Sequence, residues 1–420
     1  MIIFIINALK IIFVLGFLVF IHEGGHFLVA KLCKVRVNEF SIGFGPTIWK
    51  KQGKVTKYSV RLIPLGGYVN LEGEDEESEA EGSYSKASIP KRMAIIVAGA
   101  FVNIIFALIV YFLLIFCLGN NTSLVVDKMI PQYAAENAGI KTDDKIIKVN
   151  GKKIYTKSDL DNILKECDGE ELTITINRNQ EEMELKVIPT KKEYKSTGIY
   201  LKSTDSGEST KIITIDSNSI AEKVGLKAND EIIKINEKEV KNQNEIISTI
   251  EDEDTRILNI IVKRGNEELS YELKPDVNYI YYLGIYFKQA DNTFGNRIYY
   301  AVFETKDFCL SIFENLKMIF TGKAKVDQFM GPVGISEVVA NTNQIKDFVY
   351  ILAVISLSLG VTNLLPIPAL DGGKFLLLII ELIRRKKLNE KTEMNIQLFG
   401  FILLIALSIY VTYNDILRIL

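Results

Sequence analysis

The sequence predicts a polytopic α-helical membrane protein: four transmembrane helices, a membrane-associated β-hairpin region and two inserted α+β domains. Three observations support this fold class. Apolar runs near both ends of the 420-residue chain reach the length of about 20 residues that a helix needs to cross a bilayer. A polar stretch rich in Lys and Glu separates these runs. That stretch also contains an internal repeat, which is typical of tandem domains.

Charge and cysteine content exclude several other classes. The chain has 50 basic and 52 acidic residues, so nothing favours nucleic acid as a partner. The four cysteines lie far apart and form no CxxC pair. A disulfide framework is therefore not expected.

The four predicted spans cover roughly residues 3–31, 93–118, 349–383 and 396–418. The first is too long for a signal-peptide core and has no basic residues before it, so we expect it to be retained. The third is interrupted by polar residues, two prolines and a Gly pair between Asn363 and Gly373. Irregular backbone at membrane depth is tolerated where it lines a cavity or a site.

Basic residues predict the orientation. The loop RRKKLNEK, residues 384–391, carries five basic residues and one acid, which places it in the cytoplasm. With four spans, the loop before residue 93 is cytoplasmic too, whereas both chain ends and the middle segment lie outside.

The predicted domains follow from these boundaries. Residues 1–34 form the first transmembrane helix, and 35–92 form a cytoplasmic β-hairpin or re-entrant loop. Within the latter, residues 39–74 have the pattern of short strands interrupted by Gly and Pro. Two interpretations stay open: a simple β-meander, or a hairpin whose edge pairs with an extended substrate.

The middle segment contains two copies of one unit. AGIKTDDKIIKVNGKKI at 138–154 matches VGLKANDEIIKINEKEV at 224–240, and TGIYLK at 197–202 matches LGIYFK at 283–288. Both pairs are offset by 86 positions, which predicts two tandem domains at 122–202 and 203–290.

Residues 291–348 are expected to be an amphipathic helix and a linker. Apolar side chains recur at helical spacing within 295–325, and the charges between them exclude a membrane span. Such a helix would lie on membrane lipids or pack on the inserted domains. Residues 384–395 complete the organisation as a short cytoplasmic loop before the last span.

The stretch HEGGH in the first span is the strongest candidate site. It holds both histidines of the chain, His22 and His26, with Glu23 between them. Residues four apart share a helix face, so the two imidazoles can bind one zinc ion while the glutamate acts as general base. The alternative is a pair of packed or hydrogen-bonded histidines. Ionisable groups in a span are costly, which favours the functional interpretation.

A catalytic zinc needs a third protein ligand, and the sequence has no third histidine. Cys33 lies about 10 Å further along the helix, which is too far to share the ion. Glu39 would be in a loop outside the membrane. Asp371, an acid inside the interrupted third span, is the natural partner.

The repeated pattern resembles a PDZ domain of the bacterial, circularly permuted kind. The segments AGIKTDDKIIKVNG and VGLKANDEIIKINE carry this resemblance. It implies that a peptide, by its C-terminus, adds to the strand at TGIYL or LGIYF. Ser196 and Thr197 stand where a bulky apolar residue is usual at the start of TGIYL, which makes peptide binding less expected for the first copy. One or both copies could instead be only spacers or size filters.

The motifs together resemble the site-2 protease family of intramembrane metalloproteases, of the regulator-of-sigma-E protease type. These motifs are HEGGH, GFGP, IPLGGYV, the tandem repeat, GPVGIS and NLLPIPALDGGK. The resemblance implies that His22, His26 and Asp371 bind one zinc ion and that Glu23 is the catalytic base. It also implies that Asn363 holds the substrate, and that Pro366 and Pro368 shape the bend. Gly24 departs from the family, which often has a bulky residue there, and we expect it to alter packing only.

The expected function is hydrolysis of peptide bonds inside transmembrane segments of membrane proteins that have already been trimmed. The resemblance implies anti-sigma factors and remnant signal peptides as substrates, in a bacterial cytoplasmic membrane with the PDZ copies outside. Two alternatives stay open: a membrane-anchored PDZ scaffold with a non-catalytic zinc site, and a membrane zincin that cleaves soluble peptides.

Overall fold

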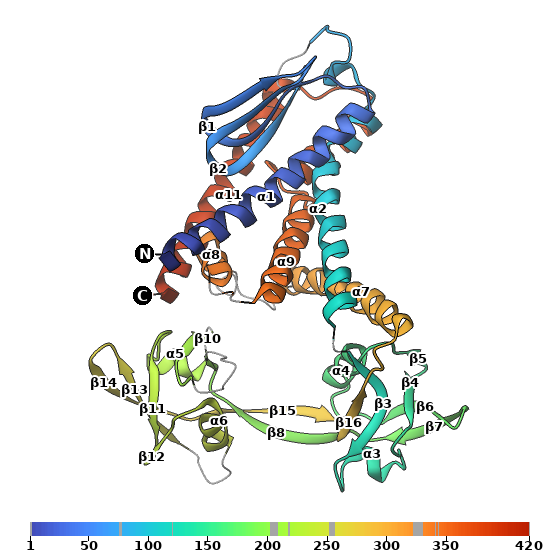
Figure 1. Ribbon diagram of the computed structural model, residues 1–420, viewed down its shortest axis with the longest axis vertical. Coiled ribbons are helices and arrows are strands. Elements are labelled where there is room, and N and C mark those ends of the chain that lie inside the picture. Colours follow the sequence, from blue (N-terminus) through green and yellow to red (C-terminus); the bar gives the residue numbers. More distant parts are fainter. Residues whose placement is uncertain are drawn as a thin grey trace. The chain divides into compact units, whose positions relative to one another are not determined.

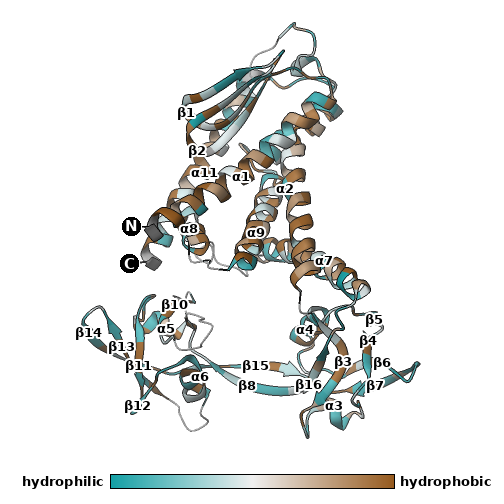
Figure 2. Ribbon diagram, in the orientation of Figure 1, coloured by the Kyte–Doolittle hydropathy of each residue, from teal (hydrophilic) through white to brown (hydrophobic). Residues whose placement is uncertain are grey.

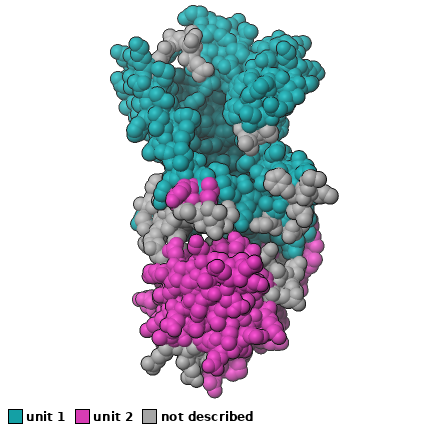
Figure 3. All heavy atoms as spheres, turned by 90° about the vertical axis from the view of Figure 1, so that its left-hand side faces the viewer, with its two compact units in different colours: residues 1–119, 304–323, 330–412 teal, residues 120–303, 324–329, 413–420 magenta. Residues whose placement is uncertain are grey.

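The chain forms two compact units, which are described separately (Figure 3). A computed structural model describes residues 2–74, 78–119, 121–201, 209–216, 219–251, 257–321, 331–340, 342 and 344–419. The first unit contains Met1–Gly119, Glu304–Lys323 and Met330–Thr412, and the second contains most of the segment between. The start of the predicted domain 203–290 and the end of the stretch 295–325 lie outside the described residues.

Four helices in the described part of the chain are long and apolar enough to cross a membrane. They are α1 (Ile2–Leu32), α2 (Ile89–Leu118), α9 (Ile345–Asn363) and α11 (Glu390–Ile419). Their ribbons are mostly apolar in Figure 2, whereas the strands of the second unit are mostly polar. The prediction of four apolar spans joined to sheet-rich regions is therefore confirmed.

The third predicted span, 349–383, is not one helix. Helix α9 ends at Asn363, and α10 begins at Asp371 and ends at Arg384. The seven residues between them contain Pro366 and Pro368, which cannot continue a helix without losing hydrogen bonds. Of the two pieces, only α9 has the length and composition of a span.

The hairpin region consists of two long bent strands, β1 (Val37–Gln52) and β2 (Lys57–Leu71). Residues Glu39–Ile42 pair on one side with Gly67–Asn70 and on the other with Lys57–Val60, while Thr47–Gln52 pair with Lys57–Arg61. The bends fall where Gly43, Gly45 and Gly66 adopt positive φ angles, which only glycine adopts at little cost. The predicted short strands are thus halves of two long strands, and they form one small sheet (Figure 1).

Glu39 is part of this sheet. Its carboxylate accepts hydrogen bonds from Ser59 Oγ at 2.6 Å, Lys57 Nζ at 3.0 Å and Arg61 Nη2 at 3.0 Å. Burial alone would raise the pKa of Glu39, but these donors outweigh it and hold the pKa at about 2. Glu39 therefore joins the two strands and is not directed to the histidines.

The second unit contains two α+β domains with the same element order. The first domain has β3 (Thr122–Met129), α3 (Ala134–Asn137), β4 (Lys145–Val149), β5 (Lys152–Lys153), α4 (Lys157–Glu166), β6 (Leu172–Arg178) and β7 (Glu181–Val187). The second has β10 (Ile212–Ile215), α5 (Ile220–Val224), β11 (Glu231–Ile235), β12 (Lys238–Glu239), α6 (Gln243–Glu251), β13 (Leu258–Arg264) and β14 (Glu267–Leu273). Elements β4 to β7 begin 86 residues before β11 to β14, so the sequence repeat is a repeat of structure.

A buried ion pair occurs at the same place in both domains. Arg178 Nε and Nη2 each lie 2.7 Å from a carboxylate oxygen of Asp144, and Arg264 makes the same two bonds to Asp230 at 2.6 and 2.7 Å. The aspartate side chains are 1% and 0% exposed. Each arginine also donates to the carbonyl of the glycine in the AGI or VGL turn.

The boundary predicted between the two domains, at residues 202 and 203, is wrong. Strand β9 (Ile199–Leu201) pairs with β10 of the second domain, and β16 (Ile285–Gln289) pairs with β3 of the first. The side chains follow the pairing, because Ile199 packs on the second core and Leu283 on the first. The second domain is therefore an insertion within the first, connected by the two-stranded ribbon β8 (Thr190–Ser196) and β15 (Asp276–Tyr282).

The stretch at 295–320 forms one helix, α7 (Phe294–Phe320), and α8 (Pro332–Ala340) follows. Within the second unit, Phe303 of α7 stacks on Tyr155 with ring centroids 4.1 Å apart. Within the first unit, Phe308 stacks on Tyr111 of α2, also at 4.1 Å. Helix α7 thus packs on protein along both parts of its length.

The repeated ion pair gives a stability prediction with its own control. Removing an arginine leaves a buried carboxylate without a counter-charge, which is strongly destabilising. Arg264→Gln should speed amide hydrogen exchange in the second domain by at least roughly tenfold and leave the first domain protected. Arg178→Gln should do the reverse. Hydrogen exchange of the full chain, read by mass spectrometry, checks both, and equal loss in the two domains would contradict it.

Candidate metal centre

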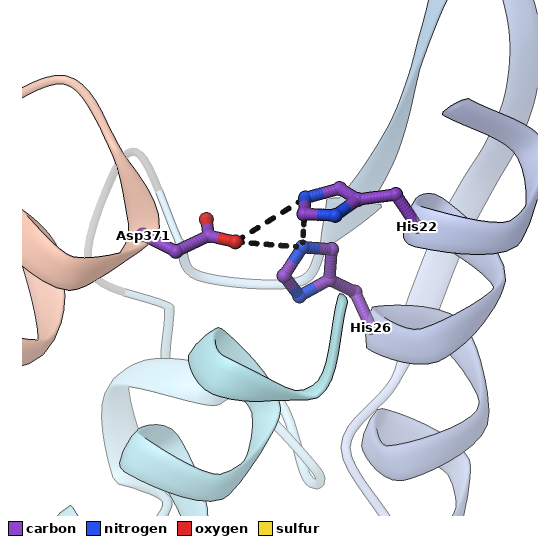
Figure 4. A group of neighbouring side chains, drawn as sticks. All are labelled: His22, His26 and Asp371. Atoms are coloured by element: carbon purple, nitrogen blue, oxygen red, sulfur yellow. Dashed lines mark hydrogen bonds and ion pairs between the residues drawn. The ribbon is translucent and has the colours of Figure 1, made fainter. Parts of the chain in front are cut away.

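The two histidines project from one face of α1. Their Nε2 atoms lie 3.2 Å apart, because residues four positions apart lie on the same side of a helix (Figure 4). Nδ1 of His26 lies 2.8 Å from the carbonyl oxygen of Ile95 in α2. A carbonyl only accepts hydrogen bonds, so this Nδ1 carries the proton and Nε2 presents a lone pair.

Asp371 is the first residue of α10. A carboxylate at this position is stabilised by the partial positive charge of the helix N-terminus. The preceding turn packs closely on the same helix end: a Cβ on Gly372 would lie 2.2 Å from the carbonyl oxygen of Leu365, and one on Gly373 would lie 2.3 Å from that of Ile367. Glycine at both positions is therefore a steric requirement of the break between α9 and α10.

The three side chains converge on one point (Figure 4). Oδ2 of Asp371 lies 3.2 Å from His22 Nε2 and 3.5 Å from His26 Nε2. This oxygen is buried and has no hydrogen-bond partner in the part of the chain that the structure describes. Apart from its approach to the two imidazoles, this buried oxygen has no described partner, and it needs a positive charge between the three side chains, which a bound metal ion supplies.

The spacing fits zinc. Ligand atoms about 2.0 Å from a tetrahedral ion lie about 3.3 Å from one another, close to the separations of 3.2, 3.2 and 3.5 Å found here. Two imidazoles and one carboxylate are also the donor set of many catalytic zinc sites, which keep a fourth position for water or substrate.

Glycines on α1 and α2 make room for this centre. A Cβ on Gly99 would lie 2.4 Å from His26 Nε2 and 2.9 Å from His22 Nε2, so any larger residue would occupy the space between the rings. A Cβ on Gly25 would lie 2.6 Å from the carbonyl oxygen of Ala98. Gly25 thus lets the two helices approach, whereas a Cβ on Gly24 would meet nothing within 4 Å.

Asn103 of α2 contacts the other nitrogen of His22. Its Nδ2 lies 3.4 Å from His22 Nδ1, and its Oδ1 is buried without a partner in the described parts of the chain. Rotating the amide by 180° would exchange these two atoms, so that Oδ1 would accept from His22 Nδ1–H. In that arrangement Asn103 leaves the Nε2 lone pair of His22 facing Asp371, as Ile95 does for His26.

Glu23 lies beside the centre, in a cavity of about 500 Å³. The cavity is lined by His22, Glu23, His26, Tyr68, Val69, Asn70, Leu71, Glu74, Tyr84, Ile95, Ile96, Asp371 and Lys374. Gly67 of β2 packs against Glu23, since a Cβ there would lie 3.3 Å from Glu23 Cγ. The last residues of β2 therefore form one wall of the cavity that holds the histidines.

Two ion pairs hold the parts of the site together. Arg92 of α2 donates to Glu381 of α10 at 2.8 Å, and the two side chains are only 12% and 8% exposed. Lys374, one turn after Asp371, lies 3.0 Å from Glu74 Oε1 at the end of the hairpin region. Helix α10 is thus fixed both to α2 and to the segment after β2.

The structure brings together four of the five residues singled out from the sequence. His22, Glu23, His26 and Asp371 line one cavity, whereas Asn363 is a half-buried residue at the end of α9 and is absent from the described lining. Sequence reasoning missed Asn103 and Gly99. A polar Asn in the middle of an apolar span, four residues after that glycine, was the available signal.

Asn103 gives a prediction about metal affinity. Outer partners of metal-binding histidines contribute about 10–100-fold to affinity. Asn103→Leu should therefore raise the zinc dissociation constant by about that factor, and Asn103→Asp, which keeps an acceptor, should restore most of it. Competition with a chelator on the purified protein measures this. Ser356→Ala is the control, because Ser356 bonds only the backbone carbonyl of Asn103 in the described contacts; equal affinities in all variants would contradict the assignment.

Comparison with known proteins gives a consistent result. The profile of Peptidase family M50 matches residues 10–407. A Fusobacterium nucleatum protein named "Putative zinc metalloprotease FN1322" is 30% identical over 411 residues, covering 96% of this chain and 97% of that protein. The "Regulator of sigma E protease" of Haemophilus influenzae is 29% identical over 441 residues, covering 97% and 98%. The "Regulator of sigma-W protease RasP" of Bacillus subtilis is 28% identical over 462 residues, covering 99% of each.

Solved structures add little. The PDZ domain of HtrA3 bound to a phage-derived ligand is 20% identical and covers 21% of this chain and 92% of that chain, with a TM-score of 0.19. A similarity of this size carries no argument about the inserted domains.

Proposed function

Because the chain belongs to peptidase family M50, the site-2 proteases, we propose that His22, His26 and Asp371 hold one zinc ion and that Glu23 is the catalytic base. The protein is an integral membrane protein and a zinc metalloendopeptidase. The observation that carries the residue assignment is the convergence of the buried Asp371 Oδ2 on two imidazole nitrogens, at 3.2 and 3.5 Å.

Each residue has one chemical task. A zinc ion bound by the three ligands supplies a Lewis acid, which polarises the scissile carbonyl and lowers the pKa of water toward about 7. Glu23 accepts a proton from the attacking water as its oxygen bonds to the carbonyl carbon. As the carbon–nitrogen bond breaks, Glu23 returns that proton to the leaving amine. Asn363 and the bend formed by Pro366 and Pro368 are proposed to hold the substrate chain near Asp371.

Strand β2 is proposed to bind the substrate. Gly67–Asn70 pair with β1 on one side, and Tyr68–Leu71 line the cavity. A substrate segment that unwinds from its helix exposes its carbonyls and can then pair with such an edge. Exposed apolar side chains on the same hairpin, among them Ile48, Trp49 and Leu62, support its contact with lipid or substrate.

Orientation and partners are proposed from charge and from the repeat. The basic loop 384–391 favours a cytoplasmic position, which puts the metal centre near the cytoplasmic face and the two inserted domains outside. We assign these domains to the PDZ class. The names of two relatives, regulators of sigma E and sigma W, support trimmed anti-sigma factors as substrates, with remnant signal peptides as a second group. The PDZ domains would exclude untrimmed substrates or bind their new C-termini.

The strand exchange changes the proposal for peptide binding. Thr197 and the strand after it belong to the second domain, because the Thr197 carbonyl accepts a hydrogen bond from Ala221 N–H and β9 pairs with β10, while Ser196 ends the connecting strand β8. The first domain is completed by Leu283, Gly284 and β16. The less suitable binding segment is therefore that of the second domain, and the first is the better candidate for a peptide C-terminus.

Two variants test the proteolytic role: one changes the proposed catalytic base, and the other changes a proposed zinc ligand. Glu23→Gln should keep zinc yet lower cleavage of a co-expressed model transmembrane substrate by at least about 100-fold, since positioned acid–base groups contribute about 10²–10⁴. Asp371→Asn should weaken zinc retention and abolish cleavage. Unchanged cleavage in Glu23→Gln would refute the assignment.

A second model substrate, with the same cleavable segment at another position, tests whether cleavage takes place within the membrane. If the cleavable segment is moved out of the membrane, cleavage should fall. A protease that acts on soluble peptides would instead cleave the substrate whose cleavable segment lies outside the membrane better than the one whose segment lies within it.

A further inference from the structure

A second pocket of about 670 Å³ lies where α1 ends and α2 begins. Its wall comes from three stretches of the first unit: residues 31–36 at and after the end of α1, Val55 in the turn between β1 and β2, and residues 81–91 before and within α2. None of its lining residues lines the metal cavity. It is therefore a separate hollow, built from the same cytoplasmic segment.

The pocket is strongly basic. Five cationic side chains line it, Lys31, Lys34, Arg36, Lys86 and Lys91, against the single acid Glu81. Lys31 donates to Thr56 and Lys86 pairs with Glu79. Within the described residues, the other three cations form no ion pair at 4 Å or less. Among the five cations only Lys86 has an ion-pair partner within 4 Å in the described residues, so the excess of positive charge around this hollow favours an anionic ligand.

The position of the pocket indicates which kind of anion would bind there. The two adjoining helices are candidate membrane spans, Ile5–Leu32 and Ile89–Leu118, so the pocket lies at the depth where a span leaves the hydrocarbon. Lipid phosphates occupy this depth, and the cytoplasmic leaflet is the one rich in anionic lipid. Cys33, Val35, Val55 and Ala87 add apolar wall to the same pocket, which suits the glycerol and first methylenes below a headgroup.

We propose that this pocket binds the headgroup of one anionic phospholipid. Lys34, Arg36 and Lys91 contact its phosphate, and the apolar residues contact its glycerol. The lipid joins the end of α1 to the start of α2. This inference does not depend on the proteolytic function, because no residue of the pocket takes part in the proposed chemistry.

The test compares two lipids with the same acyl chains on the purified full-length protein. Phosphatidylglycerol and phosphatidylcholine compete in neutral detergent, and native mass spectrometry counts the bound molecules. The wild-type chain should retain one phosphatidylglycerol in preference to phosphatidylcholine. Each cation near an anionic headgroup contributes roughly fivefold, so the triple variant Lys34→Gln, Arg36→Gln, Lys91→Gln should lose at least about tenfold of that preference.

The control removes the same charge elsewhere. Lys50→Gln, Lys51→Gln, Lys54→Gln alters exposed lysines at the end of β1 and in the following turn, none of which lines the pocket, and it should keep the preference within about twofold. A charge-conserving triple, Lys34→Arg, Arg36→Lys, Lys91→Arg, should also keep it. Zinc content reports whether each variant is folded, and if the Gln triple loses zinc, the single variants Lys34→Gln and Lys91→Gln replace it.

Three outcomes overturn the proposal. Equal preference in the wild type and the pocket variants would show that the pocket is not the site. An equal loss in the Lys50, Lys51 and Lys54 control would show a general charge effect. Displacement of the lipid by millimolar inorganic phosphate would show a site for free phosphate instead of a lipid.

Discussion

The structure depends on one contact, the approach of the Asp371 carboxylate to the Nε2 atoms of His22 and His26. Without a cation, three electron-rich atoms would face one another in a largely buried place, which is unfavourable. Zinc reverses the sign of that interaction and stabilises the same geometry. The ion would therefore hold α1 and α10 together, although their ligands are some 345 residues apart in the chain.

Several otherwise unrelated features serve this contact. The proline-containing break between α9 and α10 places a helix N-terminus, and with it Asp371, beside the histidines. Gly25 and Gly99 remove side chains where α1, α2 and the rings meet. The buried pair of Arg92 and Glu381 fixes α10 against α2, which also carries the partners of both imidazole Nδ1 atoms. Helix α2 thus acts as the support on which the two halves of the centre are aligned.

Much of this centre could be predicted from the sequence. The spacing of the two histidines identifies one helix face, and the shortage of other ligands leaves Asp371 as the partner. The apolar runs likewise predict four spans. Asn103 and Gly99 could not be assigned, because their roles depend on which face of α2 meets α1, and hydropathy does not encode that choice in a helix that is apolar on all sides.

Strand pairing was the other limit. The segments at 197–202 and 283–288 have nearly the same sequence, so each is compatible with either domain core. Which core each segment joins depends on which strand it pairs with in the folded chain. In the structure β9 pairs with β10 of the second domain, and β16 pairs with β3 of the first. In the hairpin region, the glycines identify the positions of the bends. The sequence pattern does not show, however, that each strand continues through its bend, so it suggests short strands in place of two long ones.

X-ray absorption spectroscopy at the zinc edge of the purified protein tests the central claim most directly. The account predicts a first shell of nitrogen and oxygen at about 2.0–2.1 Å, with the multiple scattering of two imidazoles and no sulfur. In Asp371→Asn the zinc should be depleted or its oxygen shell altered. A sulfur shell near 2.3 Å, or one imidazole in place of two, would contradict the proposed centre.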